Sequence, residues 1–130
     1  MKAIDTNVAL RLIVGDDEAQ TKIAVRLLDD DVALVTLSVA METEWVLRAG
    51  YRWERVRIAD ALTAFAALEN IEFQNWPGVR WAIERMRGGA DFADMIHLIS
   101  AVDAECLATF DRRLAKRAGA APPRPIMTLT

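Results

Sequence analysis

Cysteine, histidine and lysine are scarce in this chain of 130 residues, and their scarcity excludes several classes of protein. The only cysteine, Cys106, cannot form a disulfide within the chain, which indicates a reducing compartment such as the cytoplasm. No apolar run approaches the roughly 20 residues that a membrane-spanning helix needs, so we expect no association with a membrane. Residues 1–14 lack a basic segment ahead of their apolar stretch, which Asp5 also interrupts, and this argues against a signal peptide.

Positive charge is limited overall, because the formal net charge is −3. The chain therefore lacks a global basic field that would attract nucleic acid. Its basic residues nevertheless gather in two stretches, at 48–57 and at 112–117. Each stretch is either a solvated helix face or part of a local rim that follows phosphate groups around an acidic centre.

Hydrophobic residues are plentiful at 53%, so a packed core is expected and disorder is not. A chain of this length buries about two-thirds of its unfolded surface on folding. The sequence contains no repeats, low-complexity segments or linker. We therefore predict a single domain over residues 1–130.

The pattern of apolar residues predicts short strands that alternate with helices. Strands are expected at residues 2–5, 32–37, 71–73, 106–110 and 126–129. Ser38 is the expected N-cap of the helix that ends at Gly50, and Asp29-Asp30-Asp31 is the expected solvated turn. Such alternation indicates an α/β fold with a parallel sheet covered on both faces, in which ligands bind beyond the carboxyl ends of the strands.

Four acidic residues stand at the ends of apolar runs or just inside a helix start: Asp5, Glu42, Asp94 and Asp111. Carboxylates beside buried apolar surface are costly unless something pairs with them. Two carboxylates about 4 Å apart repel by roughly 4 kcal/mol at an effective dielectric of about 20. A hard divalent cation, which prefers oxygen ligands, relieves this repulsion if the fold gathers the four. Any one of them could instead cap a helix or a turn, but the four contexts together favour a cation site that hydrolyses phosphate esters.

Four segments around these acids carry a resemblance to a known family. They are Asp5-Thr6-Asn7-Val8, Glu42 with Trp45-Val46-Leu47, Gly89-Ala90-Asp91-Phe92-Ala93-Asp94, and Thr109-Phe110-Asp111-Arg112-Arg113. In order and spacing they resemble PIN-domain ribonucleases, and among these the VapC toxins of bacterial and archaeal toxin–antitoxin pairs. The resemblance covers nearly the whole chain. It implies a PIN-like fold, which is a three-layer α/β/α sandwich with a small central parallel sheet.

The resemblance also implies an endoribonuclease in which Mg²⁺ or Mn²⁺ supports the attack of water on an RNA phosphodiester. The residues that match the acidic catalytic and metal-binding positions of the family are Asp5, Glu42, Asp94 and Asp111. The residues that match its small polar neighbours, which orient carboxylates or water, are Thr6, Asn7 and Thr109. The family uses no covalent nucleophile, and the sequence contains no Ser–His or Cys–His pairing that suggests one.

Two acidic positions have a neighbour that competes for the same role. Glu42 and Glu44 are two apart on a helix and cannot both face one site, and the spacing before Trp45 favours Glu42. Asp91 and Asp94 share a helix face; Asp94 matches the ligand position, whereas Asp91 either caps the helix or joins the site.

Two further kinds of side chain lie close to these acids in the sequence. His97 follows Asp94 by one helical turn and is either a half-buried histidine or a partner of a carboxylate. At least one of Arg112 and Arg113, which directly follow Asp111, is expected near the substrate phosphate.

The family also implies partners, namely an RNA substrate, a cognate antitoxin that lies across the active-site groove, and a second copy of the chain in a homodimer. The apolar helices at 38–68, with Trp45, Tyr51 and Trp53, are a candidate surface for one of the protein contacts. Two other functions stay open: a non-catalytic PIN-like module that binds RNA or protein, and an aspartate-based phosphatase or phosphotransfer domain. The latter needs a positioned lysine, and lysine occurs only at positions 2, 22 and 116.

Overall fold

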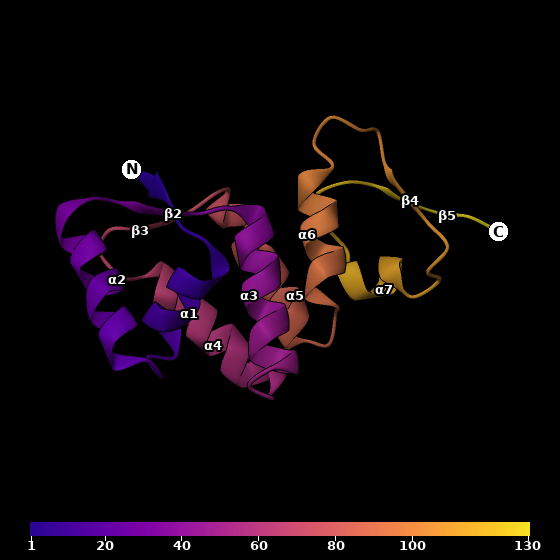
Figure 1. The fold of residues 1–130 in the computed structure, drawn as a ribbon. Coiled ribbons are helices and arrows are strands. Elements are labelled where there is room, and N and C mark those ends of the chain that lie inside the picture. The colour runs from indigo at the N-terminus through magenta and orange to yellow at the C-terminus, as the bar shows by residue number, and fades with distance from the viewer. The chain divides into compact units, whose positions relative to one another are not determined.

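The computed structural model describes residues 1–130 and shows a mixed α/β chain with two compact units (Figure 1). The first unit comprises Met1–Trp76 and the second comprises Pro77–Thr130. Each unit has its own parallel strands and its own helices. The predicted alternation of strands and helices is confirmed along the whole chain.

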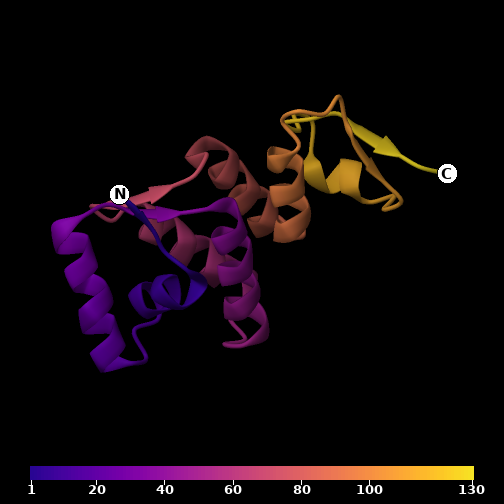
Figure 2. The same ribbon diagram turned by 45° about the horizontal axis from the view of Figure 1, so that its top comes forward.

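Three strands and four helices form the first unit. They are β1 (Lys2–Ala3), α1 (Thr6–Ile13), α2 (Glu18–Asp30), β2 (Ala33–Val35), α3 (Leu37–Ala49), α4 (Arg55–Ala66) and β3 (Ile71–Phe73). The strands pair in parallel in the order β1-β2-β3, with Lys2 opposite Ala33 and Ala33 opposite Ile71. In Figures 1 and 2 these strands lie along the upper edge of the unit, and α1 to α4 lie below them.

Alternating burial shows which face of this sheet belongs to the core. The buried residues of β2 and β3 are Ala33, Val35, Ile71 and Phe73, while the residues between them are half-buried or exposed. Because side chains alternate between the two faces of a strand, the buried four share one face. Phe65 of α4 packs edge-on against Phe73, with 5.8 Å between the ring centroids, so aromatic packing joins this helix to the sheet.

Helix α3 begins at a different residue from the one predicted, because a different side chain caps its first turn. Thr36, and not Ser38, is the N-cap, and its Oγ1 accepts a hydrogen bond from the Val39 N–H at 3.4 Å. The Ser38 hydroxyl instead shares a hydrogen bond with the Thr36 hydroxyl. A second N–H group at this end, that of Leu37, donates to Gln74 Oε1 at 2.9 Å. The helix therefore begins earlier than predicted, and β2 is correspondingly shorter.

The acidic run after α2 is not the solvated turn that its composition suggests. Asp29 and Asp30 form the last turn of α2, and Asp31 is its C-cap. The Asp31 carboxylate accepts a hydrogen bond from Lys2 Nζ at 2.8 Å and pairs with the N-terminal amine at 2.6 Å. These cations hold the pKa of Asp31 well below its usual range. Asp31 therefore fastens the beginning of β1 to the end of α2.

The second unit contains three helices and two strands. They are α5 (Trp76–Arg87), which begins at the boundary, then α6 (Phe92–Ser100), β4 (Leu107–Thr109), α7 (Leu114–Ala118) and β5 (Ile126–Thr128). Strands β4 and β5 pair in parallel, with Leu107 opposite Ile126, and they lie side by side in Figure 1. Helix α6 is largely buried, but neither it nor any other helix combines the length and apolar character needed to cross a membrane.

One buried hydroxyl in α3 has no hydrogen-bond partner, and this generates a prediction about stability. The side chain of Thr43 is 1% exposed, and its Oγ1 is unsatisfied. Replacement of Thr43 by valine, which keeps the shape of the side chain and removes the polar atom, is expected to raise the free energy of unfolding by about 1 kcal/mol. Urea denaturation measures this change. A loss of stability of similar size would show that the hydroxyl has a partner and would contradict the prediction.

Candidate functional site

Asp5 stands where β1 ends and α1 begins, as predicted. It is the N-cap of α1, and its Oδ1 accepts a hydrogen bond from the Val8 N–H at 3.0 Å. The neighbouring Thr6 is buried and Asn7 is exposed. One oxygen of the exposed Asp5 carboxylate is therefore committed to the helix, and the other is available to a ligand.

The fold of the first unit brings Asp5 and Glu42 to one polar pocket. This pocket has a volume of about 240 Å³, and its lining residues are Asp5, Thr6, Asn7, Ser38, Val39 and Glu42. Its walls come from the beginning of α1 and the first half of α3, two segments that lie more than thirty positions apart in the sequence. Two of the predicted acidic residues and two of their predicted polar neighbours thus share a cavity.

Glu42 and Glu44 have different environments on α3. Glu42 is exposed at the pocket, whereas Glu44 is 3% exposed and belongs to the buried face of the helix. Glu44 Oε2 accepts a hydrogen bond from Arg48 Nε at 3.0 Å, one helical turn along. Glu44 is therefore already paired, and Glu42 is the carboxylate that remains accessible beside Asp5.

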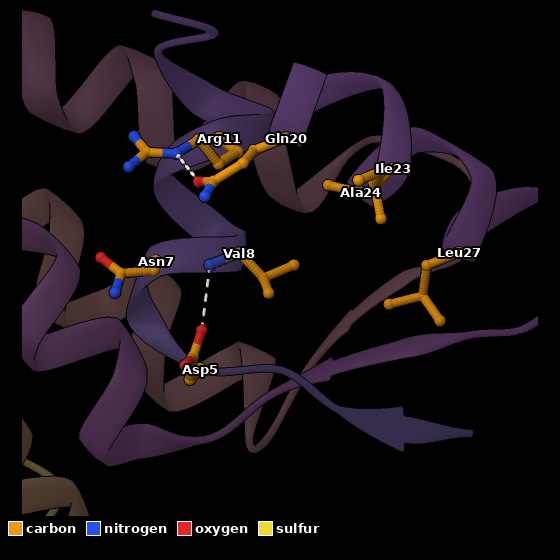
Figure 3. A pocket seen from close by; sticks show the side chains of 8 residues that line it. All are labelled: Asp5, Asn7, Val8, Arg11, Gln20, Ile23, Ala24 and Leu27. Atoms are coloured by element: carbon orange, nitrogen blue, oxygen red, sulfur yellow. Dashed lines mark hydrogen bonds between the residues drawn. The ribbon is translucent and has the colours of Figure 1, made fainter. Parts of the chain in front are cut away.

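Asp5 also lies at the edge of a second, more apolar cavity of about 500 Å³ between α1 and α2 (Figure 3). The apolar lining comes from Val8 of α1 and from residues of α2 that include Ile23 and Leu27. Beyond Val8, the Arg11 side chain donates from Nε to Gln20 Oε1 at 2.7 Å, and Figure 3 shows this bond at the far end of the cavity. The Asp5 carboxylate thus stands between polar and apolar surface.

In the second unit, hydrogen bonds to backbone N–H groups position two further carboxylates. Asp91 is the N-cap of α6, and its Oδ1 accepts from the Asp94 N–H at 3.0 Å. Asp111 follows β4; its own N–H donates to Thr109 Oγ1 and its Oδ1 accepts from the Arg113 N–H, each at 2.9 Å. Both carboxylates lie at their predicted positions, and Thr109 accepts a hydrogen bond from the backbone of Asp111.

Asp94 shares a pocket of about 160 Å³ with Asp91 and Asp111. Burial raises the pKa of the Asp94 carboxyl, and the nearby charges of Asp91 and Asp111 raise it further, while His97 opposes them. Asp94 lies in the first turn of α6, where the helix dipole favours a negative charge. Desolvation and repulsion outweigh that contribution, so this pocket holds more negative charge than its surroundings neutralise.

The acidic side chains in these two pockets suit a hard divalent cation, because such a cation prefers oxygen ligands, and Thr6, Asn7 and Ser38 add further oxygen atoms to the first pocket. The raised pKa of Asp94 supports this fit, since a bound cation would relieve the repulsion that raises it. The structure contains no group of three or more acidic, histidine or cysteine side chains arranged to hold a metal ion. Asp5 and Glu42 belong to the first unit, and Asp94 and Asp111 belong to the second.

The structure also distinguishes among the predicted basic and aromatic neighbours. Arg113 lines the acidic pocket and Arg112 does not, and Arg117, which belongs to the predicted basic stretch at 112–117, lines it as well. His97 is exposed and not half-buried.

The predicted aromatic surface of residues 38–68 is smaller than expected. Trp45 is 57% exposed, whereas Tyr51 and Trp53 are half-buried. The Tyr51 hydroxyl donates to Asp16 Oδ2 at 2.7 Å, and Arg57 stacks on the Trp53 ring at 3.8 Å from its centroid. Trp45 is therefore the aromatic side chain of this set that stays open to a partner.

Asp94 generates a prediction about the pH dependence of stability. Because its pKa is raised, the folded state holds the proton more tightly than the unfolded chain does. The resulting penalty is absent below the ordinary range of aspartate, grows as the pH rises through the raised pKa, and is complete above it. Replacement of Asp94 by asparagine should therefore stabilise the protein at neutral pH by about 0.5 kcal/mol, the size typical of partly exposed charges. The difference should vanish at acidic pH.

Urea unfolding in the presence of a chelator, repeated from acidic to neutral pH, measures this effect. The exposed Asp103 of the same unit, replaced by asparagine, is the matched control and should show no such trend. An Asp94→Asn protein that is less stable than wild type at neutral pH would contradict the proposed balance of charges.

Comparison with known protein families identifies the family of this chain. A scan against models of protein families matches the PIN domain over residues 2–120, a span that includes every acidic residue of both pockets. No curated protein and no solved structure gives a significant match. The match bears out the predicted α/β class, with its helices and small parallel sheet. The chain therefore belongs to the PIN-domain family, whose members are typically metal-dependent nucleases.

Proposed function

We propose that this chain is a Mg²⁺- or Mn²⁺-dependent endoribonuclease that acts as the toxin of a type II toxin–antitoxin pair, with residues 1–130 working as one PIN-like nuclease domain. The observation that carries the proposal is the environment of Asp94, a partly desolvated carboxyl that faces Asp91 and Asp111. A carboxylate group that is held in this way, in a chain of the PIN family, is suited to binding a cation.

The proposed ligands are Asp5 and Glu42 from the first unit and Asp94 and Asp111 from the second. Asp5 and Asp111 each commit one oxygen, Oδ1, to a backbone N–H group, which fixes the carboxylate and leaves Oδ2 for a cation. Asp91 is proposed as an accessory residue, because its carboxylate caps α6 while it contributes charge to the pocket. Glu44 is not proposed as a ligand, since it is paired with Arg48.

When bound, the cation supplies Lewis acidity towards the phosphoryl oxygens and lowers the pKa of the attacking water. The side chains of the protein perform the remaining tasks. Thr6, Asn7 and Thr109 are proposed to orient the carboxylates and the water, and Thr109 Oγ1 accepts a hydrogen bond from the backbone N–H of Asp111. At least one of Arg112 and Arg113 was expected near the substrate phosphate. Arg113 lines the acidic pocket, so we propose that Arg113 makes this contact.

The proposed partners are an RNA substrate, a cognate antitoxin that covers the acidic groove with a basic side chain, and a second copy of the chain. Trp45 is the side chain of α3 that supports a protein contact, because a tryptophan that is 57% exposed is costly to leave in water. The cytoplasm is the proposed compartment, since the single Cys106 is unpaired.

Cleavage assays test the catalytic proposal directly. Replacement of Asp5 or Asp94 by asparagine is expected to slow Mg²⁺-dependent cleavage of RNA by about a hundredfold or more, because each removes a metal ligand that acts in the transition state. Single-turnover cleavage of total cellular RNA by the purified proteins, with sequencing of the new ends, gives the rate and the sites. Asp103→Asn is the control. Unchanged cleavage by either ligand variant would eliminate the proposal.

The effect of metal on thermal stability distinguishes the catalytic proposal from a non-catalytic PIN-like module. It also shows which of Glu42 and Glu44 contributes to metal binding. A cation that binds only the folded state raises the melting temperature. Glu42→Gln should reduce this rise, since a tenfold weaker affinity removes about 1.4 kcal/mol at saturating metal.

Glu44→Gln should have the opposite pattern to Glu42→Gln. It should lower the free energy of unfolding in a chelator by about 1 kcal/mol, since Arg48 is 48% exposed, and so lower the melting temperature. It should keep the full rise of the melting temperature on adding metal. Thermal unfolding of the three proteins with and without Mg²⁺ or Mn²⁺ measures both effects. A wild-type protein that gains no stability from either metal would favour the non-catalytic module.

The phosphotransfer alternative gains no support from the lysines of the first unit. Lys2 pairs with Asp31 and Lys22 pairs with Glu18, so neither ammonium group is directed to the pocket of Asp5 and Glu42. We therefore retain hydrolysis without a covalent intermediate as the proposed reaction.

A further inference from the structure

Four basic side chains converge on one cavity of the second unit. The cavity has a volume of about 440 Å³, and its basic lining residues are Arg85, Arg113, Lys116 and Arg117. No carboxylate lines it, and none of the four side chains forms an ion pair with a carboxylate. Like charges that are gathered without a counter-charge repel one another, so this cavity is complementary to an anion.

Two of these guanidinium groups are fixed in place by main-chain carbonyl groups. Arg85 Nε donates to the carbonyl oxygen of Arg117 at 2.9 Å, and Arg117 Nη1 donates to the carbonyl oxygen of Gly89 at 3.2 Å. Each bond uses one N–H group and leaves the others of that guanidinium unused. The guanidinium groups of Arg85 and Arg117 are therefore held in position before a ligand binds, which reduces the entropic cost of binding.

Two glycines with positive φ make room for these side chains. Gly89 has a φ of 120° and Gly119 has a φ of 87°. A Cβ atom on Gly89 would lie 2.8 Å from Arg117 Nη1, and one on Gly119 would lie 2.9 Å from Arg85 Cζ. Any larger residue would strain the backbone and displace a guanidinium group as well. The two glycines therefore leave space for the guanidinium groups of Arg117 and Arg85.

This basic cavity is contiguous with the acidic pocket of the same unit, because Arg113 and Arg117 line both. We propose that the basic cavity is a subsite for a phosphate group of the RNA strand that neighbours the phosphodiester to be cleaved. The inference depends on the proposed function for the identity of the strand. An extended strand that places one phosphate at the acidic pocket carries its next phosphates past this adjoining surface.

The chemistry of the cavity suits a phosphate group. Guanidinium groups form paired hydrogen bonds with phosphate oxygens, and Lys116 adds a compact positive charge. Because the chain as a whole carries a net charge of −3, attraction for a phosphate backbone has to come from a local site of this kind. The subsite would hold the strand irrespective of base sequence, since phosphate contacts carry no base information.

Binding of a fluorescein-labelled oligouridylate to the full chain in a chelator, where cleavage cannot proceed, tests the subsite. The double variant Arg85→Gln/Lys116→Gln is compared with Arg26→Gln/Arg80→Gln, which removes the same charge from exposed positions outside the cavity. We expect the first pair to weaken binding about tenfold at low salt. We also expect it to reduce the slope of log affinity against log salt by about 0.7, the value for one phosphate of a single strand. The control pair should leave both quantities near those of wild type.

The single variant Lys116→Gln provides a test even if the double variant misfolds. Lys116 is exposed and has no side-chain partner in the protein, so its loss cannot unfold the chain, and a smaller weakening in the same direction is expected. Unchanged affinity in both cavity variants, or an equal loss in the control pair, would overturn the subsite. A third outcome would also overturn the RNA subsite. In that outcome, the cavity residues are needed for binding of inorganic phosphate but have no effect on the affinity for oligouridylate, which would assign the cavity to free phosphate.

The binding and cleavage assays test the subsite and the nuclease proposal independently. If Asp5→Asn cleaves RNA as fast as wild type while the cavity variants still weaken oligouridylate binding, the nuclease proposal fails and the phosphate subsite stands. If cleavage depends on the carboxylates but the cavity variants bind oligouridylate normally, the subsite alone fails.

Discussion

A hydrogen bond from a backbone N–H group to a carboxylate fixes each junction on which the candidate site depends. Asp5 accepts from Val8, Asp91 accepts from Asp94, and Asp111 accepts from Arg113, each at about the same short distance of 2.9 or 3.0 Å. One bond ends an extended segment, starts the next turn and holds the carboxylate still. If such a residue were replaced by one without an acceptor, the helix or turn would be weakened by about 1 kcal/mol and the carboxylate would be lost with it. Structure and proposed chemistry therefore constrain the same side chains.

Asp94 is the exception, and the difference explains the electrostatics of the second unit. Its carboxylate accepts no hydrogen bond from the protein and is partly desolvated beside two other acids, so its pKa is raised despite the helix dipole. Arg113 and Arg117 are close by, yet Arg117 donates to a main-chain carbonyl and neither forms an ion pair with these acids. The unit keeps its opposite charges in adjoining pockets without pairing them. The two pockets are therefore the proposed places for ligands of opposite sign, a cation at the carboxylates and a phosphate at the guanidinium groups.

The sequence predicted those parts of the fold and site that neighbouring residues decide. Asp5 and Asp91 are caps because an aspartate before an apolar helix can reach an N–H three residues ahead, and β3 is a strand bounded by turn residues. The errors have long-range causes. Gln74 satisfies the start of α3 from 37 positions away, and Lys2 converts the end of α2 from a solvated turn into an ion pair across 29 positions. The basic stretch at 112–117 was predicted, but the contribution of Arg85 to the basic cavity was not, since Arg85 reaches the Arg117 carbonyl across 32 positions.

Charged side chains in this protein follow a pattern that depends on where they stand. Within a helix, an acid and a base three or four positions apart neutralise each other, as Glu18 does with Lys22 and Glu44 with Arg48. At three junctions between elements, the carboxylates of Asp5, Asp91 and Asp111 bond to backbone N–H groups, which fix their position but cancel little of their charge. Asp31, by contrast, is paired with Lys2 and the N-terminal amine, so uncompensated charge collects at those three junctions. The same principle explains why Glu44, although it lies two residues from Glu42 and is the more buried of the two, is the weaker candidate ligand. Burial next to a built-in partner satisfies a carboxylate, and a satisfied carboxylate has little free energy to gain from a cation.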